Sequence, residues 1–133
     1  MVIHDNIFNN MNMLSGEKIS AEKNIADMLK LLGHKTRIRI ILEIGAEEAC
    51  VCHLVNTLGE RQAYISQQLM VLRDAGILKT RKEGRFVYYS LSSNQLLDLI
   101  GLTGKVAGTP VNLLEDLYQT SQCLCPKCHS PQK

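Results

Sequence analysis

Five cysteines in two clusters are the residues whose chemistry is most telling in this sequence. Cys50 and Cys52 stand two residues apart in the middle of the chain, and Cys123, Cys125 and Cys128 follow near its end. Thiolates select soft metal ions, and the Cys-x2-Cys spacing of the second cluster is common in metal sites. Three sulfurs suit pyramidal As(III) or Pb(II), whereas four suit Cd(II) or Zn(II). The clusters therefore predict a site for a soft metal or metalloid.

The spacing of the first pair restricts where it can bind an ion. In a continuous helix, residues two apart point about 200° away from each other, so Cys50 and Cys52 can share an ion only where the chain enters a helix. The sequence places them at such an entrance, and a helix N-terminus favours the thiolate form. The alternative is that both are small buried hydrophobic residues.

The C-terminal cluster allows two arrangements. The tail could bind one ion by itself, or it could fold back so that one or two of its thiolates join Cys50 and Cys52. We favour the joint site, because a self-contained tail has no obvious route to the rest of the protein. His53 and His129 adjoin these cysteines and could replace a sulfur, although neither is our first choice. An incidentally Cys-rich terminus is the remaining alternative.

Length and charge narrow the class of protein. With 133 residues and a net charge of +2, the chain is one small domain that cannot coat nucleic acid without preference. Without an apolar run of membrane-spanning length or a signal-peptide core, we expect a cytoplasmic protein with no membrane partner. In that reducing compartment, clustered cysteines are metal ligands or redox sensors more often than structural disulfides. We expect a flexible arm over 1–19, a folded domain over 20–121 and a Cys-rich tail over 122–133.

Periodicity predicts a helix-turn-helix in the middle of that domain. Apolar residues at helical spacing predict helices from Ser20 to Gly33, from about Lys35 to Gly45, from Val51 to Leu58 and from Gln62 to Ala75. The last two, joined by a turn of about four residues, match a helix-turn-helix. Its second helix offers polar groups of the kind that read base edges, although a merely polar surface is the alternative. These candidate DNA-reading residues are Gln62, Ala63, Tyr64, Ser66, Gln67 and Gln68.

A basic hairpin follows directly. Strand-forming residues predict one strand from Leu78 to about Lys82, a turn at Glu83-Gly84 and a return strand from Arg85 to Leu91. Protection of an edge strand could explain some of its cations. Their position beside a reading helix makes DNA contact the better explanation, so the hairpin is interpreted as a wing. The cations are Lys79, Arg81, Lys82 and Arg85.

The outer helices carry more apolar surface than a small domain can bury. Besides the first helix, we expect one capped by Ser93 and another that begins at Thr109-Pro110. We therefore expect these helices to form the interface of a homodimer. The predicted fold class is mostly α with a small β-hairpin, a dimeric winged helix-turn-helix.

From Leu31 to Leu91 the sequence resembles the ArsR/SmtB family of metal-sensing repressors. The matching pieces are LLGHKTRIRIIL, CVCHL, ISQQLMVLRDAGIL and EGRFVYYSL, in the family order. The resemblance implies a winged-helix homodimer that binds operator DNA, with Cys50 and Cys52 at a thiolate sensor position and Ser66 on the reading helix. Two departures are HKTR for the family's Asp-Pro-Thr-Arg, and Gln68 where the family often has His. The second departure bears on which operator is read.

The sequence thus predicts a repressor that leaves operator DNA when As(III), Sb(III), Cd(II), Pb(II) or Zn(II) binds its thiolates. An interface site for Zn or Ni, which relatives place on the helix after the wing, is not expected, because SSNQLLDLIGLTGKVAG lacks His and has only Asp98. Two alternatives remain: a repressor of the same fold that senses thiol oxidation or persulfide, and a zinc-knuckle interaction module. Catalysis is not expected, since the sequence shows no nucleophile–base set, phosphate loop or paired carboxylates.

Overall fold

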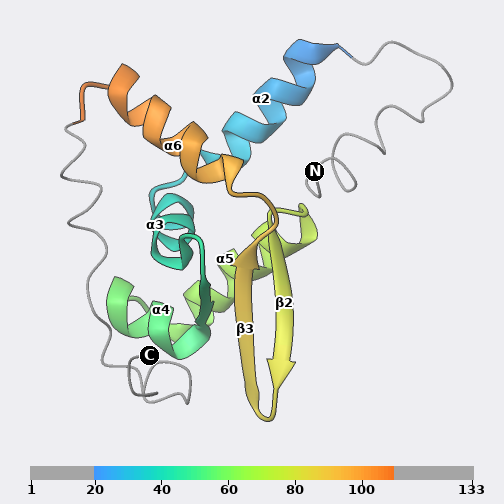
Figure 1. Cartoon of the computed structure of the whole chain (residues 1–133), viewed down its shortest axis with the longest axis vertical. Coiled ribbons are helices and arrows are strands. Elements are labelled where there is room, and N and C mark those ends of the chain that lie inside the picture. Colours follow the sequence, from blue (N-terminus) through green and yellow to red (C-terminus); the bar gives the residue numbers. More distant parts are fainter. Residues whose placement is uncertain (1–19, 110–133) are drawn as a thin grey trace, which may run out of the picture.

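The structure, a computed structural model, describes residues 20–109 (Figure 1). The four helices predicted from Ser20 to Ala75 are confirmed to within a residue or two, as is the helix after the wing. The N-terminal arm, the helix expected after Pro110 and the three C-terminal cysteines lie outside the described residues. In chain order the elements are α2 (Ala21–Leu32), α3 (Lys35–Ile44), β1 (Glu48–Cys50), α4 (Val51–Leu58), α5 (Gln62–Asp74), β2 (Leu78–Glu83), β3 (Phe86–Leu91) and α6 (Gln95–Val106).

Local chemistry fixes the helix ends that matter for the site. Ser20 caps α2, since its Oγ accepts a hydrogen bond from the Lys23 N–H at 3.1 Å. Gly59 ends α4 with φ of 70°, a left-handed conformation in which a side chain would be strained, and its N–H donates to the carbonyl of Val55. The chain then turns within three residues into α5, which gives the expected helix-turn-helix.

The sheet has one strand more than the sequence predicted. Its order is β1-β3-β2, all antiparallel, so the short β1 adds a third strand to the wing hairpin. A three-residue strand is too short to show alternation, so periodicity did not predict it. The turn also shifts by one residue, because Glu83 pairs with Phe86 and leaves Gly84 and Arg85 to make it.

The two faces of this sheet pack differently. Ala49, Leu78 and Leu91 belong to the main core, together with residues of all five described helices. On the opposite face, Cys50 and Tyr88 form a separate buried cluster with Cys52 and Phe86 packed against it. Because side chains alternate between the faces of a strand, the step from Ala49 to Cys50 is a step from the core to this second cluster.

The main core is centred on α3 and the inner face of α5. On α5, helical spacing predicts a buried stripe of Ile65, Leu69 and Leu72, and all three are fully buried. On α3 the same spacing predicts that Ile38, Ile41 and Leu42 face inward. The observed burial is wider, because Ile40 and Ile44 are also buried, while Ile38 is only partly buried. Since α3 contacts α4, α5, α6 and the sheet, it is the central helix of the domain.

Two helices at one end leave apolar residues uncovered. Figure 1 shows α2 and α6 together at the end of the molecule opposite to the tip of the β2–β3 hairpin. Ile25 and Leu29 of α2 and Leu102 and Val106 of α6 are all at least half exposed in the single chain. An apolar pocket of about 290 Å³ lies between α2, α3 and α6. None of the described helices is both long enough and apolar enough to cross a membrane.

Candidate nucleic-acid interface and thiolate pair

The first turns of α5 present an open polar surface. Gln62, Ala63 and Gln67 are exposed, and Ser66 is partly exposed, while the opposite side of the helix is buried in the core. The N-cap residue Arg61 makes no side-chain capping bond, so the first N–H groups of α5 have no side-chain acceptor from the cap. Such N–H groups bind phosphate well. This end of α5 can therefore contact both a base edge and the DNA backbone.

Two of the six candidate reading residues are held by α3. Gln68 is buried, and its Oε1 accepts a hydrogen bond of 2.8 Å from Nε of Arg37. The hydroxyl of Tyr64 donates to Oγ1 of Thr36 at 3.3 Å. Gln68 is therefore placed to fix α5 on α3, and Tyr64 shares that task at the edge of the reading surface.

Arg37 and Arg39 of α3 lie at positions where helical periodicity predicts a solvated outer face. In the structure both are instead partly buried and donate hydrogen bonds to main-chain carbonyls. Arg37 donates to the carbonyl of Leu31 at 3.0 Å as well as to Gln68, so it ties α2, α3 and α5 together. Their amphipathic side chains conceal this role in the sequence, because a long Arg stem packs in the core while its head finds carbonyl acceptors.

The four cations of the wing fall into two groups. Lys79, Lys82 and Arg85 are exposed, and none of the ion pairs within residues 20–109 involves them. Arg81, by contrast, contacts two carboxylates. The wing therefore presents three cations to an approaching phosphate, whereas the fourth, which is also exposed, is paired with two carboxylates.

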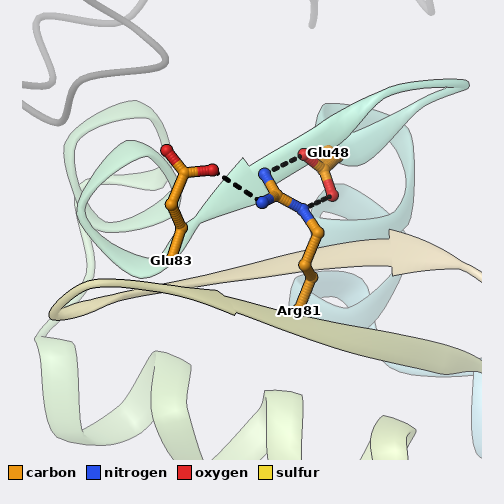
Figure 2. Close-up of polar contacts among 3 residues, drawn as sticks. All are labelled: Glu48, Arg81 and Glu83. Atoms are coloured by element: carbon orange, nitrogen blue, oxygen red, sulfur yellow. Dashed lines mark hydrogen bonds and ion pairs between the residues drawn. The ribbon is translucent and has the colours of Figure 1, made fainter.

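Figure 2 shows Arg81 between Glu48 and Glu83. Its Nε and Nη2 donate to the two carboxylate oxygens of Glu48 at 2.9 and 2.7 Å, and its Nη1 donates to Glu83 at 2.7 Å. The guanidinium also lies 4.7 Å from the centre of the Tyr88 ring. The hydrogen bonds to Glu48 first, and to Glu83 second, raise the pKa of Arg81 above its ordinary value.

Cys50 and Cys52 come together at the entrance of α4. Cys50 ends β1 and is the N-cap of α4 with extended backbone, and its sulfur accepts the N–H of His53 at 3.4 Å. This change from strand to helix brings the two sulfurs to 2.8 Å, as the sequence required of a shared site. The side chain of Cys50 is buried, and Cys52 is disulfide-bonded in this structure.

The neighbouring histidine is engaged by another residue. Nε2 of His53 lies 2.8 Å from a carboxylate oxygen of Glu43 on α3, and both side chains are largely buried. This contact holds the start of α4 against α3. It also weakens the interpretation of His53 as a substitute for a thiolate.

The two sulfurs fit part of a soft-ion site. Their chemistry and proximity suit such an ion, yet residues 20–109 contain no group of three or more Cys, His, Asp or Glu that could hold it. Cys123, Cys125 and Cys128, the predicted further ligands, lie outside this range, as does His129. Beside the pair is a pocket of about 290 Å³ between α4, the start of α5 and the wing. Its lining residues are Cys50, Val51, Cys52, Gln62, Arg85, Phe86 and Val87.

Comparison with known proteins agrees with this architecture. Residues 34–80 match the family described as "Bacterial regulatory protein, arsR family". A cadmium resistance transcriptional regulatory protein CadC homolog from Staphylococcus aureus is 37% identical over 78 residues, covering 58% of this chain and 64% of its own length. The chain spans 56% to 64% of the length of the first curated relatives that it matches.

Solved structures are similar over more of the chain. The crystal structure of Rv0081 from M. tuberculosis has a TM-score of 0.61 and 30% identity, covering 74% of this chain and 97% of that one. A homodimeric winged helix-turn-helix DNA-binding domain from Mycobacterium bovis has a TM-score of 0.56 and 22% identity, covering 69% and 89%. At 22% identity the second similarity is evidence for the fold alone, which is the winged-helix fold.

Proposed function

The chain belongs to the ArsR family of bacterial transcriptional regulators, which are not enzymes, and from this premise we propose that it is a repressor released from operator DNA by a soft metal or metalloid ion. One observation carries the proposal. The sulfurs of Cys50 and Cys52 lie 2.8 Å apart beside a pocket that Gln62 of the reading helix and Arg85 of the wing also line. An ion bound to these sulfurs would adjoin both elements that contact DNA.

Two surfaces support the DNA-binding half of the proposal. The exposed first turns of α5, with Gln62, Ser66 and Gln67, would read base edges in a major groove. Lys79, Lys82 and Arg85 of the wing would contact phosphate. A dimer would present two such units to half-sites about one helical turn apart.

The dimer itself is part of the proposal. Ile25, Leu29, Leu102 and Val106 expose apolar surface on α2 and α6, at the end of the domain away from the wing tip. Apolar patches of this kind mark protein interfaces. Pairing these two helices with those of a second copy would leave both reading helices and both wings available to one operator.

The ligand set of the ion combines described and undescribed residues. Cys50 and Cys52 would supply two thiolates, and one or two of Cys123, Cys125 and Cys128 would complete a site for As(III), Sb(III), Cd(II), Pb(II) or Zn(II). The CadC homolog is named for cadmium resistance, which supports a soft ion of this class. Such a regulator would act in the cytoplasm, where its thiols stay reduced.

A titration on reduced protein tests the proposal. An operator is first selected from random duplex DNA with metal-free protein, and its dissociation constant is then measured by gel shift with and without Cd(II) or arsenite. We expect either ion to weaken binding by roughly 5- to 150-fold, the range of typical coupling free energies. Excess chelating dithiol should restore binding. Unchanged affinity at saturating ion would refute the proposal.

A redox signal is the second candidate, and it has an observation of its own. The sulfur of Cys50 lies 2.8 Å from the sulfur of Cys52, which is itself disulfide-bonded in the structure. A Cys50 thiolate that attacked this disulfide would form an S–S bond to Cys52, and the sulfur previously bonded to Cys52 would leave as a thiolate. Attack on the outer sulfur of an external persulfide would transfer that sulfur and release the donor's thiol. Anaerobic titration separates the two: release by Cd(II) with a thiolate-to-metal absorption band favours the ion, and release only after oxidation favours the redox signal.

A further inference from the structure

Arg81 differs from the other cations of the wing because it contacts a carboxylate on another strand of the sheet. Lys79, Lys82 and Arg85 extend from the hairpin, whereas Arg81 reaches from β2 across β3 to the carboxylate of Glu48 on β1 (Figure 2). Two parallel N–H···O bonds make this contact bidentate, the most geometrically specific form of an Arg–carboxylate pair. The contact therefore joins the two outer strands of the sheet over its central strand.

The strand register places Cys50 in the same row. Cys50 pairs with Tyr88 on β3, and Tyr88 pairs with Arg81 on β2, so all three side chains share one face of the sheet. Glu48 lies two residues before Cys50 and shares that face as well. The Arg81 guanidinium lies over the Tyr88 ring, and Tyr88 and Cys50 form the buried cluster opposite the main core.

We propose that Arg81 is a positioning residue that couples the thiolate pair to the wing, through Tyr88 and Glu48, and is not a phosphate contact. The proposal rests on the proposed function and names the route by which an ion at Cys50 and Cys52 alters the DNA-binding surface. The observation that carries the proposal is a continuous chain of contacts. Cys50 packs against Tyr88, Arg81 lies over the Tyr88 ring, and Arg81 is hydrogen-bonded to Glu48 on the strand that ends in Cys50.

Geometry gives a reason why binding would disturb this row. Two thiolates on one tetrahedral ion with bonds of about 2.3 Å lie about 3.8 Å apart. The sulfurs of Cys50 and Cys52 are 2.8 Å apart. An ion held by both sulfurs would set their separation at that larger value, and any part of the change taken up by Cys50 acts on the buried Tyr88 against which it is packed. The bidentate contact between Glu48 and Arg81 passes such a shift of β1 to β2.

A pair of isosteric variants tests the coupling. Glu48→Gln removes the carboxylate that links Arg81 to β1. Glu83→Gln is the matched control, since it removes one carboxylate from the same guanidinium, changes the net charge equally and leaves the link to β1 intact. The link is partly exposed, and exposed ion pairs contribute little to stability, so both variants should fold.

The readouts are operator affinity of the reduced protein with and without Cd(II), its salt dependence, and the thiolate-to-Cd(II) absorption band. We expect Glu48→Gln to keep the band, the stoichiometry and the metal-free affinity, while the factor by which Cd(II) weakens binding falls by roughly fivefold or more. Glu83→Gln should retain the wild-type factor. Arg81→Lys keeps the charge but cannot form the bidentate contact, so it should behave as Glu48→Gln does.

Three outcomes would overturn the proposal. Equal Cd(II) responses in Glu48→Gln, Glu83→Gln and wild type would show that the link carries no signal. A tighter metal-free complex with a steeper salt dependence in Glu48→Gln would show that released Arg81 binds phosphate. If Cd(II) leaves wild-type affinity unchanged, the proposed function fails together with the coupling, whereas the first two outcomes leave the proposed function standing.

Discussion

The two helices of the helix-turn-helix begin in opposite ways. At the start of α4, Cys50 is 2% exposed, and its sulfur caps the helix by accepting the N–H of His53. At the start of α5, Arg61 and Gln62 are exposed, and no side chain caps the helix. The N-terminus of α4 is therefore closed by protein atoms, whereas the N-terminus of α5 is open to a partner from solution.

This difference matches the two tasks that we propose. Phosphate and base edges arrive as large rigid surfaces, so the groups that meet them must project from the fold. A soft ion is small and binds most selectively where thiolates are already close and water is excluded. One pocket is lined by Cys50 and Cys52 at the closed start and by Gln62 at the open start, so a change at the first N-terminus adjoins the second.

The largest expected effect is loss of the packing that fixes α4. Leu54→Ala should lower the free energy of unfolding by about 2–5 kcal/mol, because Leu54 is fully buried in the main core and truncation leaves a cavity. Asn56→Ala on the exposed side of α4 should change it by less than about 0.5 kcal/mol. Urea denaturation followed by circular dichroism gives both values. Equal losses would show that α4 is not anchored by its inner face.

The next prediction concerns a substitution at the closed N-terminus, that of α4. Cys50→Ser replaces one atom, and serine is a favoured N-cap, so α4 should stay capped. We expect metal-free operator affinity to stay within about twofold, while the Cd(II) effect, about 1–3 kcal/mol in the wild type, disappears. Anisotropy with a labelled operator measures both. A retained Cd(II) response would remove Cys50 from the sensor.

The third prediction concerns a substitution near the open N-terminus, that of α5. Gln67→Ala should weaken binding to the selected operator by about 1–3 kcal/mol and leave binding to unrelated DNA unchanged, because a base-edge contact carries sequence information. Gln95→Ala, an equally exposed glutamine at the start of α6, is the matched control and should affect neither. An equal loss on both kinds of DNA would assign Gln67 to the phosphate backbone.

The smallest effect is expected at the wing. Lys82→Ala should weaken binding to all sequences alike and reduce the slope of log affinity against log salt by about one, as removal of one phosphate contact does. Lys105→Ala on α6, with the same charge change at the opposite end of the domain, should leave the slope unchanged. Salt titrations from low to physiological salt decide the point. Identical slopes in the two variants would exclude Lys82 from the interface.

The comparison of the two N-termini also shows which features the sequence could reveal. Helical periodicity predicted both helices, and Gly59 predicted the turn between them, because these signals are local. The burial of Gln68 was not predictable, since it depends on Arg37, which is 31 positions away in the sequence. The sequence also could not show that Arg81 has a different role from Lys79 and Lys82. Its partner Glu48 comes from β1, a strand too short to be seen in the sequence.

The site was predictable in part for the same reason. The Cys-x-Cys spacing required a helix entrance, and the structure places the pair there, with the sulfurs 2.8 Å apart. That Cys50 belongs to a sheet and packs on Tyr88 required the pairing of β1 with β3, which joins segments about forty residues apart. Long-range pairing of this kind depends on the tertiary fold, and local propensity does not contain it.

The central claim is that one ion and one operator compete through the same protein, and linkage provides its most direct test. Cd(II) is titrated into reduced protein by the thiolate absorption band, once with and once without saturating operator DNA. We predict that the operator weakens Cd(II) binding by the same factor by which Cd(II) weakens operator binding, because the coupling between two sites is reciprocal. Identical Cd(II) affinities with and without the operator would contradict the account.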